Sequence, residues 1–214
     1  MATFADCPQC GAPVELRWAG AVQTTCAYCR SVLLRRDLDL EKVGTTAELP
    51  SLPSPIQLGT EGQWKGASFV VVGRLVYEYE RGGWSEWHFV TNEGKSGWLS
   101  DAQLEYAVTF LADAGRTIPP QPVKRLRGKP LEIGRTTYEV TSVTTAHYVG
   151  VEGELPFEYW DKEDTTFADL RGPDGAFATI DWSESPPLFF AGALTDFDTL
   201  QLRNIVQFEG WPTS

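Results

Sequence analysis

Four cysteines carry the clearest chemical signal of this chain, because they form two closely spaced pairs. Cys7 pairs with Cys10 and Cys26 with Cys29, fifteen residues separate the pairs, and the chain has no other cysteine. Each C-x2-C pair forms a tight knuckle, and two facing knuckles complete the tetrahedral S4 site that zinc prefers. Because four thiolates leave no open coordination position, the spacing predicts one structural zinc per chain and argues against zinc catalysis. Iron in the same site, two disulfides and four unliganded thiols are the alternatives.

The elements expected to carry these knuckles are short strands. Gly11 follows Cys10 directly, where a turn of positive φ favours glycine, whereas Arg30 occupies the matching place in the second knuckle. Three stretches have the alternating or apolar pattern of a strand: 14–18, 22–24 and 31–34. These features predict a zinc ribbon over residues 1–47. A unit of this size is too small to be stable by burial alone, so its folding should be coupled to metal binding.

Charge and composition restrict where the protein works and what it binds. The chain has 214 residues and a net charge of −11, and residues 1–40 are neutral, with four basic and four acidic side chains. The acidic body repels phosphate backbones, which disfavours nonspecific nucleic-acid binding. No apolar run approaches the length of a transmembrane segment, and nothing before Cys7 resembles a secretory signal. We therefore expect a cytoplasmic protein with reduced cysteines.

The rest of the chain has the pattern of a mainly β fold. Short apolar alternations are separated by turn signals, and a hairpin expected over 167–182 resembles 87–99 in the first half. Residues 100–110 combine a helical cap with strand alternation, and we favour a turn followed by a strand. The sequence therefore predicts a zinc ribbon followed by two small related β-barrel or β-roll units. The expected divisions are a Pro-rich linker at 48–55, a first β unit at 56–115, a Pro-rich and basic linker at 116–130, and a second β unit at 131–214.

Aromatic residues are the candidates for partner binding. The chain has eight tryptophans, more than a small barrel buries completely, and the segment 152–164 places six acidic residues beside three aromatic ones. Carboxylates and aromatic faces together suit a cation such as a polyamine or a Lys/Arg-rich peptide. Core packing of the tryptophans and a solvated hairpin tip are the alternatives. The candidate partner-binding residues are Trp84, Trp87, Trp98, Phe157, Tyr159 and Trp160.

The sequence identifies no catalytic residue. His88 and His147 are the only histidines, neither is spaced with a nucleophile, and no phosphate-binding, dinucleotide-binding or nucleophile-elbow motif occurs.

Several segments besides the N-terminal C-P-x-C-G knuckle resemble the bacterial family called domain of unknown function 4178. They are 58–62 (LGTEG), 66–73 (GASFVVVG), 84–87 (WSEW), 97–99 (GWL), 153–156 (GELP), 169–172 (DLRG) and 177–182 (FATIDW). The resemblance implies a noncatalytic protein with a zinc ribbon and a β domain. It also implies an association with bacterial gene clusters for membrane-stress and polyamine-related proteins.

We therefore expect a noncatalytic binding or adaptor module with a structural zinc ribbon, acting in a bacterial membrane-stress or polyamine-linked system. Its partner is expected to be another protein or a small cationic ligand. One alternative is a carboxylate-dependent enzyme of unknown substrate, which needs a deep pocket with clustered acids of shifted pKa. The other is a nucleic-acid accessory factor acting through Arg30, Arg35 and Arg36 of the ribbon.

Overall fold

The computed structural model describes residues 3–36, 39–46, 48–49, 54–102, 104–114, 117–122, 124–158 and 164–207. It confirms the mainly β fold class, because these residues form fifteen strands, three short 3-10 turns and no α-helix. The 3-10 turns are η1 (Lys124–Leu126), η2 (Pro173–Gly175) and η3 (Phe197–Leu200).

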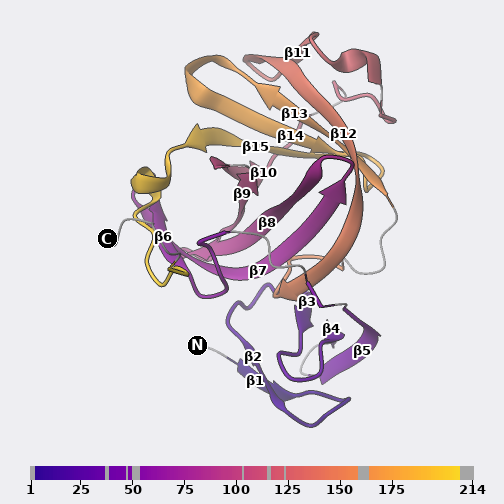
Figure 1. Ribbon diagram of the computed structural model, residues 1–214, viewed down its shortest axis with the longest axis vertical. Helices are drawn as coiled ribbons and strands as arrows, with labels where there is room; N and C mark the ends of the chain where they lie inside the picture. Colours follow the sequence, from indigo (N-terminus) through magenta and orange to yellow (C-terminus); the bar gives the residue numbers. More distant parts are fainter. Residues whose placement is uncertain are drawn as a thin grey trace.

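The N-terminal part is a small unit of two sheets, seen at the bottom of Figure 1. Strands β1 (Thr3–Asp6) and β2 (Pro13–Leu16) form a hairpin around the first cysteine pair. Strands β3 (Gln23–Thr25), β4 (Ser31–Arg36) and β5 (Asp39–Thr45) form a three-stranded sheet, and the second cysteine pair lies between β3 and β4. The three stretches expected to be strands overlap β2, β3 and β4.

The remaining strands form one large antiparallel sheet. In chain order they are β6 (Glu61–Trp64), β7 (Ala67–Tyr79), β8 (Gly82–Thr91), β9 (Ser96–Ala102), β10 (Glu105–Leu111), β11 (Pro130–Ile133), β12 (Thr136–Gly153), β13 (Thr165–Arg171), β14 (Ala176–Asp181) and β15 (Leu188–Thr195). The hairpin expected over 167–182 is present as β13, η2 and β14. The favoured turn and strand within 100–110 correspond to the end of β9 and to β10.

Strand β12 closes this sheet into a barrel. Its first part pairs with β13 as far as Ala146, and its last part, from His147 onward, pairs with β7. The pairings therefore run in a ring of eight strands, β7-β8-β9-β10-β15-β14-β13-β12, and return to β7. Figure 1 shows β12 as the long curved strand that joins the upper strands to β7 below. The strands of both predicted β units are thus joined in one barrel, because β10 pairs with β15 and β7 with β12.

The outer faces of the barrel are covered by parts of the same chain. Ile56, Leu200 and Leu202, which lie before β6 and after β15, pack on the buried outer side chains of β7 to β10. Ile118 and Leu126 pack in the same way on the outer face of β12 to β14. Because side chains alternate between the two faces of a strand, the other set of side chains points into the barrel.

Candidate metal centre and barrel lumen

The structure brings the four cysteine sulfurs together, where the β1–β2 turn meets the β3–β4 turn. All four lie within 4.8 Å of one another, and the Sγ atoms of Cys7 and Cys29, and of Cys10 and Cys26, are 3.7 Å apart. Around a tetrahedral zinc with Zn–S bonds of about 2.3 Å, neighbouring sulfurs are about 3.8 Å apart. Cys29 Sγ also lies 3.2 Å from the Ser31 hydroxyl. The donor set therefore fits one tetrahedral metal ion bound by thiolates.

The two knuckles have the same backbone conformation. The N–H of Gly11 donates to the carbonyl of Cys7 at 2.8 Å, and the N–H of Arg30 donates to the carbonyl of Cys26 at 2.9 Å. Gly11 has φ of +72° and Arg30 has φ of +58°. Arg30 therefore takes the left-handed conformation that glycine adopts more easily, at a cost on the order of 1 kcal/mol.

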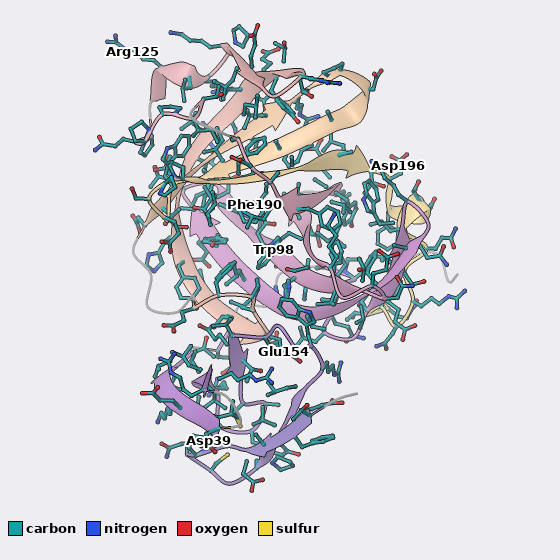
Figure 2. The ribbon with its side chains drawn as sticks, turned by 180° about the vertical axis from the view of Figure 1, so that it is seen from behind. Asp39, Trp98, Arg125, Glu154, Phe190 and Asp196 are labelled. Carbon is teal, nitrogen blue, oxygen red and sulfur yellow. The ribbon has the colours of Figure 1, made fainter. Side chains whose placement is uncertain are left out.

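The ribbon is held on the barrel by the residues that follow β12. The Glu154 carboxylate, only 3% exposed, accepts hydrogen bonds from the backbone N–H groups of Arg17 at 2.8 Å and Trp18 at 3.0 Å. The next residue, Leu155, accepts a backbone hydrogen bond from Val22 at 2.9 Å and packs in one cluster with Val32 of the ribbon. Figure 2 labels Glu154 at this junction. Glu154 is therefore a buried structural acid, although the sequence grouped it with an acidic, solvated or cation-binding segment.

His88 supports the same junction from inside the barrel, as a structural histidine. Its side chain is fully buried, with Nδ1 2.7 Å from the carbonyl oxygen of Glu154 and Nε2 2.9 Å from the Ser96 hydroxyl. Because a carbonyl only accepts, Nδ1 carries the proton and Nε2 accepts from Ser96. Burial lowers the pKa of His88 to about 4, so the ring is neutral near pH 7.

The interior of the barrel contains a cavity of about 340 Å³, to which every strand of the ring contributes. A smaller hollow of about 50 Å³ shares Glu86, Ser100, Phe167 and Thr179 with it. We call the two together the lumen. Its polar lining includes Glu86, Ser100, Ser142, Asp169, Thr179 and Asp181. A cavity of this size, with polar groups placed among aromatic ones, is typical of small-molecule binding sites.

The acidic side chains of the lumen are held in place by hydrogen bonds. Glu86 accepts from the Ser100 hydroxyl at 2.6 Å and from the Trp84 indole at 3.0 Å. Asp169 accepts from Ser142 at 2.7 Å. Burial, with smaller contributions from the charges of Asp169 and Asp181, raises the pKa of Glu86 to about 7, and burial also raises that of Asp169. Glu86 is partly buried and lines the lumen.

The predicted partner-binding aromatics lie in different places. Trp84 lines the larger cavity, and Trp98 and Phe157 line the smaller hollow, with their rings stacked at 5.8 Å. Figure 2 shows Trp98 inside the barrel near Phe190. Trp87, in contrast, is 2% exposed in the outer core, where the Arg74 guanidinium lies 4.7 Å from its ring centroid. Tyr159 and Trp160 lie outside the described residues.

The three ribbon arginines are engaged within the chain. Arg30 pairs with Glu48 at 3.4 Å, and Arg35 donates to the carbonyl of Ala19 at 2.8 Å. Arg36 pairs with both Glu41 and Glu158. These contacts with acidic and carbonyl groups do not favour a phosphate-binding role.

Sequence reasoning missed the lumen acids Glu86, Asp169 and Asp181. The sequence does contain a signal for these acids, since each lies two residues from an aromatic or polar residue on the same face of its strand. Alternation alone assigns such a polar face to solvent, so the strand topology is needed to place it inside the barrel. Only the covered outer faces show that these positions point inward.

The fold and its two sites define a closed β-barrel that carries a four-cysteine, ribbon-like metal site. Residues 57–196 match the family described as Domain of unknown function (DUF4178), and the chain belongs to this family. The match covers the barrel and leaves the cysteine ribbon outside it. No curated protein and no solved structure matches the chain. Among the described residues, no helix is long and apolar enough to span a membrane.

Proposed function

We propose that this protein is a noncatalytic binding module that takes up a small ligand in the barrel lumen. The cysteine ribbon, with zinc as its structural metal, supports one end of the barrel. The observation that carries this proposal is the lumen itself. A small barrel is ordinarily filled by side chains, whereas this one has a cavity of about 340 Å³ lined by all eight strands of the ring.

The position of the aromatic candidates supports a small ligand over a protein partner. Trp84, Trp98 and Phe157 line the lumen, where a protein surface does not reach, and Trp87 is buried in the outer core. These four candidates therefore lie in the interior of the protein and do not form a surface for a protein partner.

The experiment is a titration of the ¹⁵N-labelled, zinc-loaded protein with 1-hexanol and, separately, 1-hexylamine, followed by NMR. We expect shifts of amides in β8, β9 and β14, where lumen-facing residues lie. Leu194→Trp, which fills part of the larger cavity, should abolish these shifts, whereas Val206→Trp on the exposed surface should not. Shifts confined to the outside of the barrel, or unchanged in a folded Leu194→Trp protein, contradict the proposal.

A second candidate function is the carboxylate-dependent enzyme. An enzyme of this kind needs a deep pocket with clustered acids of shifted pKa, and the lumen has both, with a pKa of about 7 for Glu86. A carboxyl group with that pKa is suited to general acid or base catalysis. We rank binding first, because the lumen lining includes no histidine, cysteine or lysine among the described residues to act with Glu86. Turnover of any lumen-bound compound, lost in Glu86→Gln, would reverse this order.

A further inference from the structure

The lumen lining has an excess of acidic side chains. In the part of the chain that the structure describes, Glu86, Glu105, Asp169 and Asp181 line it, and Arg171 is its one basic residue. Arg171 donates to Glu105 at 2.6 Å, and both side chains are about half exposed. The basic group is therefore engaged near the solvent, and the deeper part of the lumen carries acids.

The ionised form of Glu86 is unfavourable in the absence of a cation. Burial makes the carboxyl group costly to ionise, and the charges of Asp169 and Asp181 add to that cost. A cationic group among them would lower that cost by direct charge interaction. Each Glu86 oxygen accepts one hydrogen bond, from Ser100 or Trp84, and has capacity for another.

Thr109 on β10 adds a polar atom to the smaller hollow. Its side chain is 3% exposed and lines this hollow. A hydroxyl group both donates and accepts hydrogen bonds, so it can contact a polar atom of a ligand there.

The walls beside these polar groups are aromatic. Trp84 and Phe167 lie edge to face at 5.7 Å, Trp98 and Phe157 stack, and Phe190 lies edge-on to Trp98. Aromatic faces attract ammonium groups and also cover alkyl chains.

The arrangement does not suit a bare metal ion. Among the described residues, only the four cysteines form a group of three or more side chains that could hold a metal ion. The lumen carboxylates come from four different strands, β8, β10, β13 and β14, and can contact a ligand of several atoms.

We propose that the lumen binds an organic cation, an ammonium group on an alkyl chain. The ammonium group lies beside Glu86 and Asp169, and the chain packs against Trp84, Phe167 and Trp98. This inference rests on the proposed function, since it assigns the charge of the ligand that the lumen holds.

The test compares three probes of equal length: 1-hexylamine, 1-hexanol and hexanoate. Each is titrated at pH 8 into the zinc-loaded protein, with binding measured by NMR shifts of lumen amides. We expect the amine to bind roughly tenfold or more tightly than the alcohol, and hexanoate to bind least, because a charge-assisted hydrogen bond contributes about 1.5–3 kcal/mol. Glu86→Gln should remove most of the preference for the amine and leave hexanol binding unchanged. Glu132→Gln, at an exposed position of β11, is the matched control and should leave both unchanged.

The outcomes separate the two proposals. Hexanol and hexylamine binding in the lumen with equal affinity overturns the cation assignment and leaves the binding function standing. A preference for the amine that persists in folded Glu86→Gln also overturns the assignment of this site, unless Asp169→Asn removes it. If no probe shifts the lumen amides, both proposals fail.

Discussion

The Nδ1 atom of His88 lies 2.7 Å from the backbone carbonyl oxygen of Glu154, the residue whose carboxylate receives the ribbon. A strand of the barrel wall is thereby joined, through one residue, to the backbone of Arg17 and Trp18. The Trp18 ring also lies edge to face with the His88 ring at 5.2 Å. The junction therefore depends on the buried, neutral imidazole of His88 and on the buried carboxyl group of Glu154, which accepts two backbone hydrogen bonds.

Protonation of His88 should destabilise the folded protein in acid. Because the folded pKa, about 4, lies below the ordinary value of 6.5, this group contributes stability above pH 6.5 that is lost as pH falls toward 4. The full contribution is about 3 kcal/mol. The measurement is the free energy of unfolding of wild type and His88→Gln between pH 7 and 4. The advantage of wild type should shrink across that range; a constant difference would show that His88 is not held neutral.

Replacing Glu154 tests the junction directly. Glu154→Ala leaves the N–H groups of Arg17 and Trp18 without their acceptor, and we expect a loss of about 2–3 kcal/mol. Hydrogen exchange at these two amides should accelerate most. The matched control is Glu152→Gln, two residues away and exposed, which should leave the exchange rates unchanged. Equal acceleration across all strands of the barrel would place the effect elsewhere.

The stability of the lumen should respond to pH in the opposite sense. The pKa of Glu86 is raised to about 7, so its contribution to stability is full below pH 4.5 and is lost as pH rises through 7. The pKa of Glu86 is influenced by Trp84, Ser100, Asp169 and Asp181. The Glu86→Gln variant removes the titration of Glu86 and keeps these neighbours. The stability of the variant relative to wild type should therefore increase by about 3 kcal/mol between pH 4 and pH 8. Denaturant unfolding at both pH values measures it, and a difference that does not change with pH would contradict it.

Metal removal should unfold the ribbon before the barrel. The tetrathiolate site holds two short knuckles whose own core is small, so Cys10→Ser or a strong chelator should abolish protection of amides in β1 to β5. The barrel should remain folded but lose some stability. Unfolding of the ribbon removes the packing of Val32 and the hydrogen bond from Arg17 to Glu154. Elemental analysis should give one zinc per chain in wild type. A ribbon that keeps its exchange protection without metal would show that the thiols are not needed to hold it.

The sequence was most informative where local spacing determines the structure. Cysteine spacing placed the two knuckles, and alternation with turn residues indicated the strands, because both are set within a few residues. The closure of the barrel was not predictable in this way. It depends on β12 pairing with β7, roughly 70 to 80 residues earlier, and on register shifts near Val140 and Tyr148. The lumen acids could not be assigned for the same reason, since the inward face is defined only after closure.

Relieving the left-handed turn of the second knuckle should stabilise the ribbon, because Arg30 has φ of +58° there. Glycine has no Cβ to clash in this conformation, as at Gly11 of the first knuckle, so Arg30→Gly should relieve strain of about 1 kcal/mol. Part of this gain is offset by the greater freedom of glycine in the unfolded chain and by loss of the exposed pair with Glu48. Arg30→Ala, which loses the same pair but keeps a Cβ, is the control. We expect the ribbon to be more stable in Arg30→Gly than in Arg30→Ala, measured as the chelator concentration that releases half of the zinc. Equal release would show that the left-handed turn imposes no strain on this knuckle.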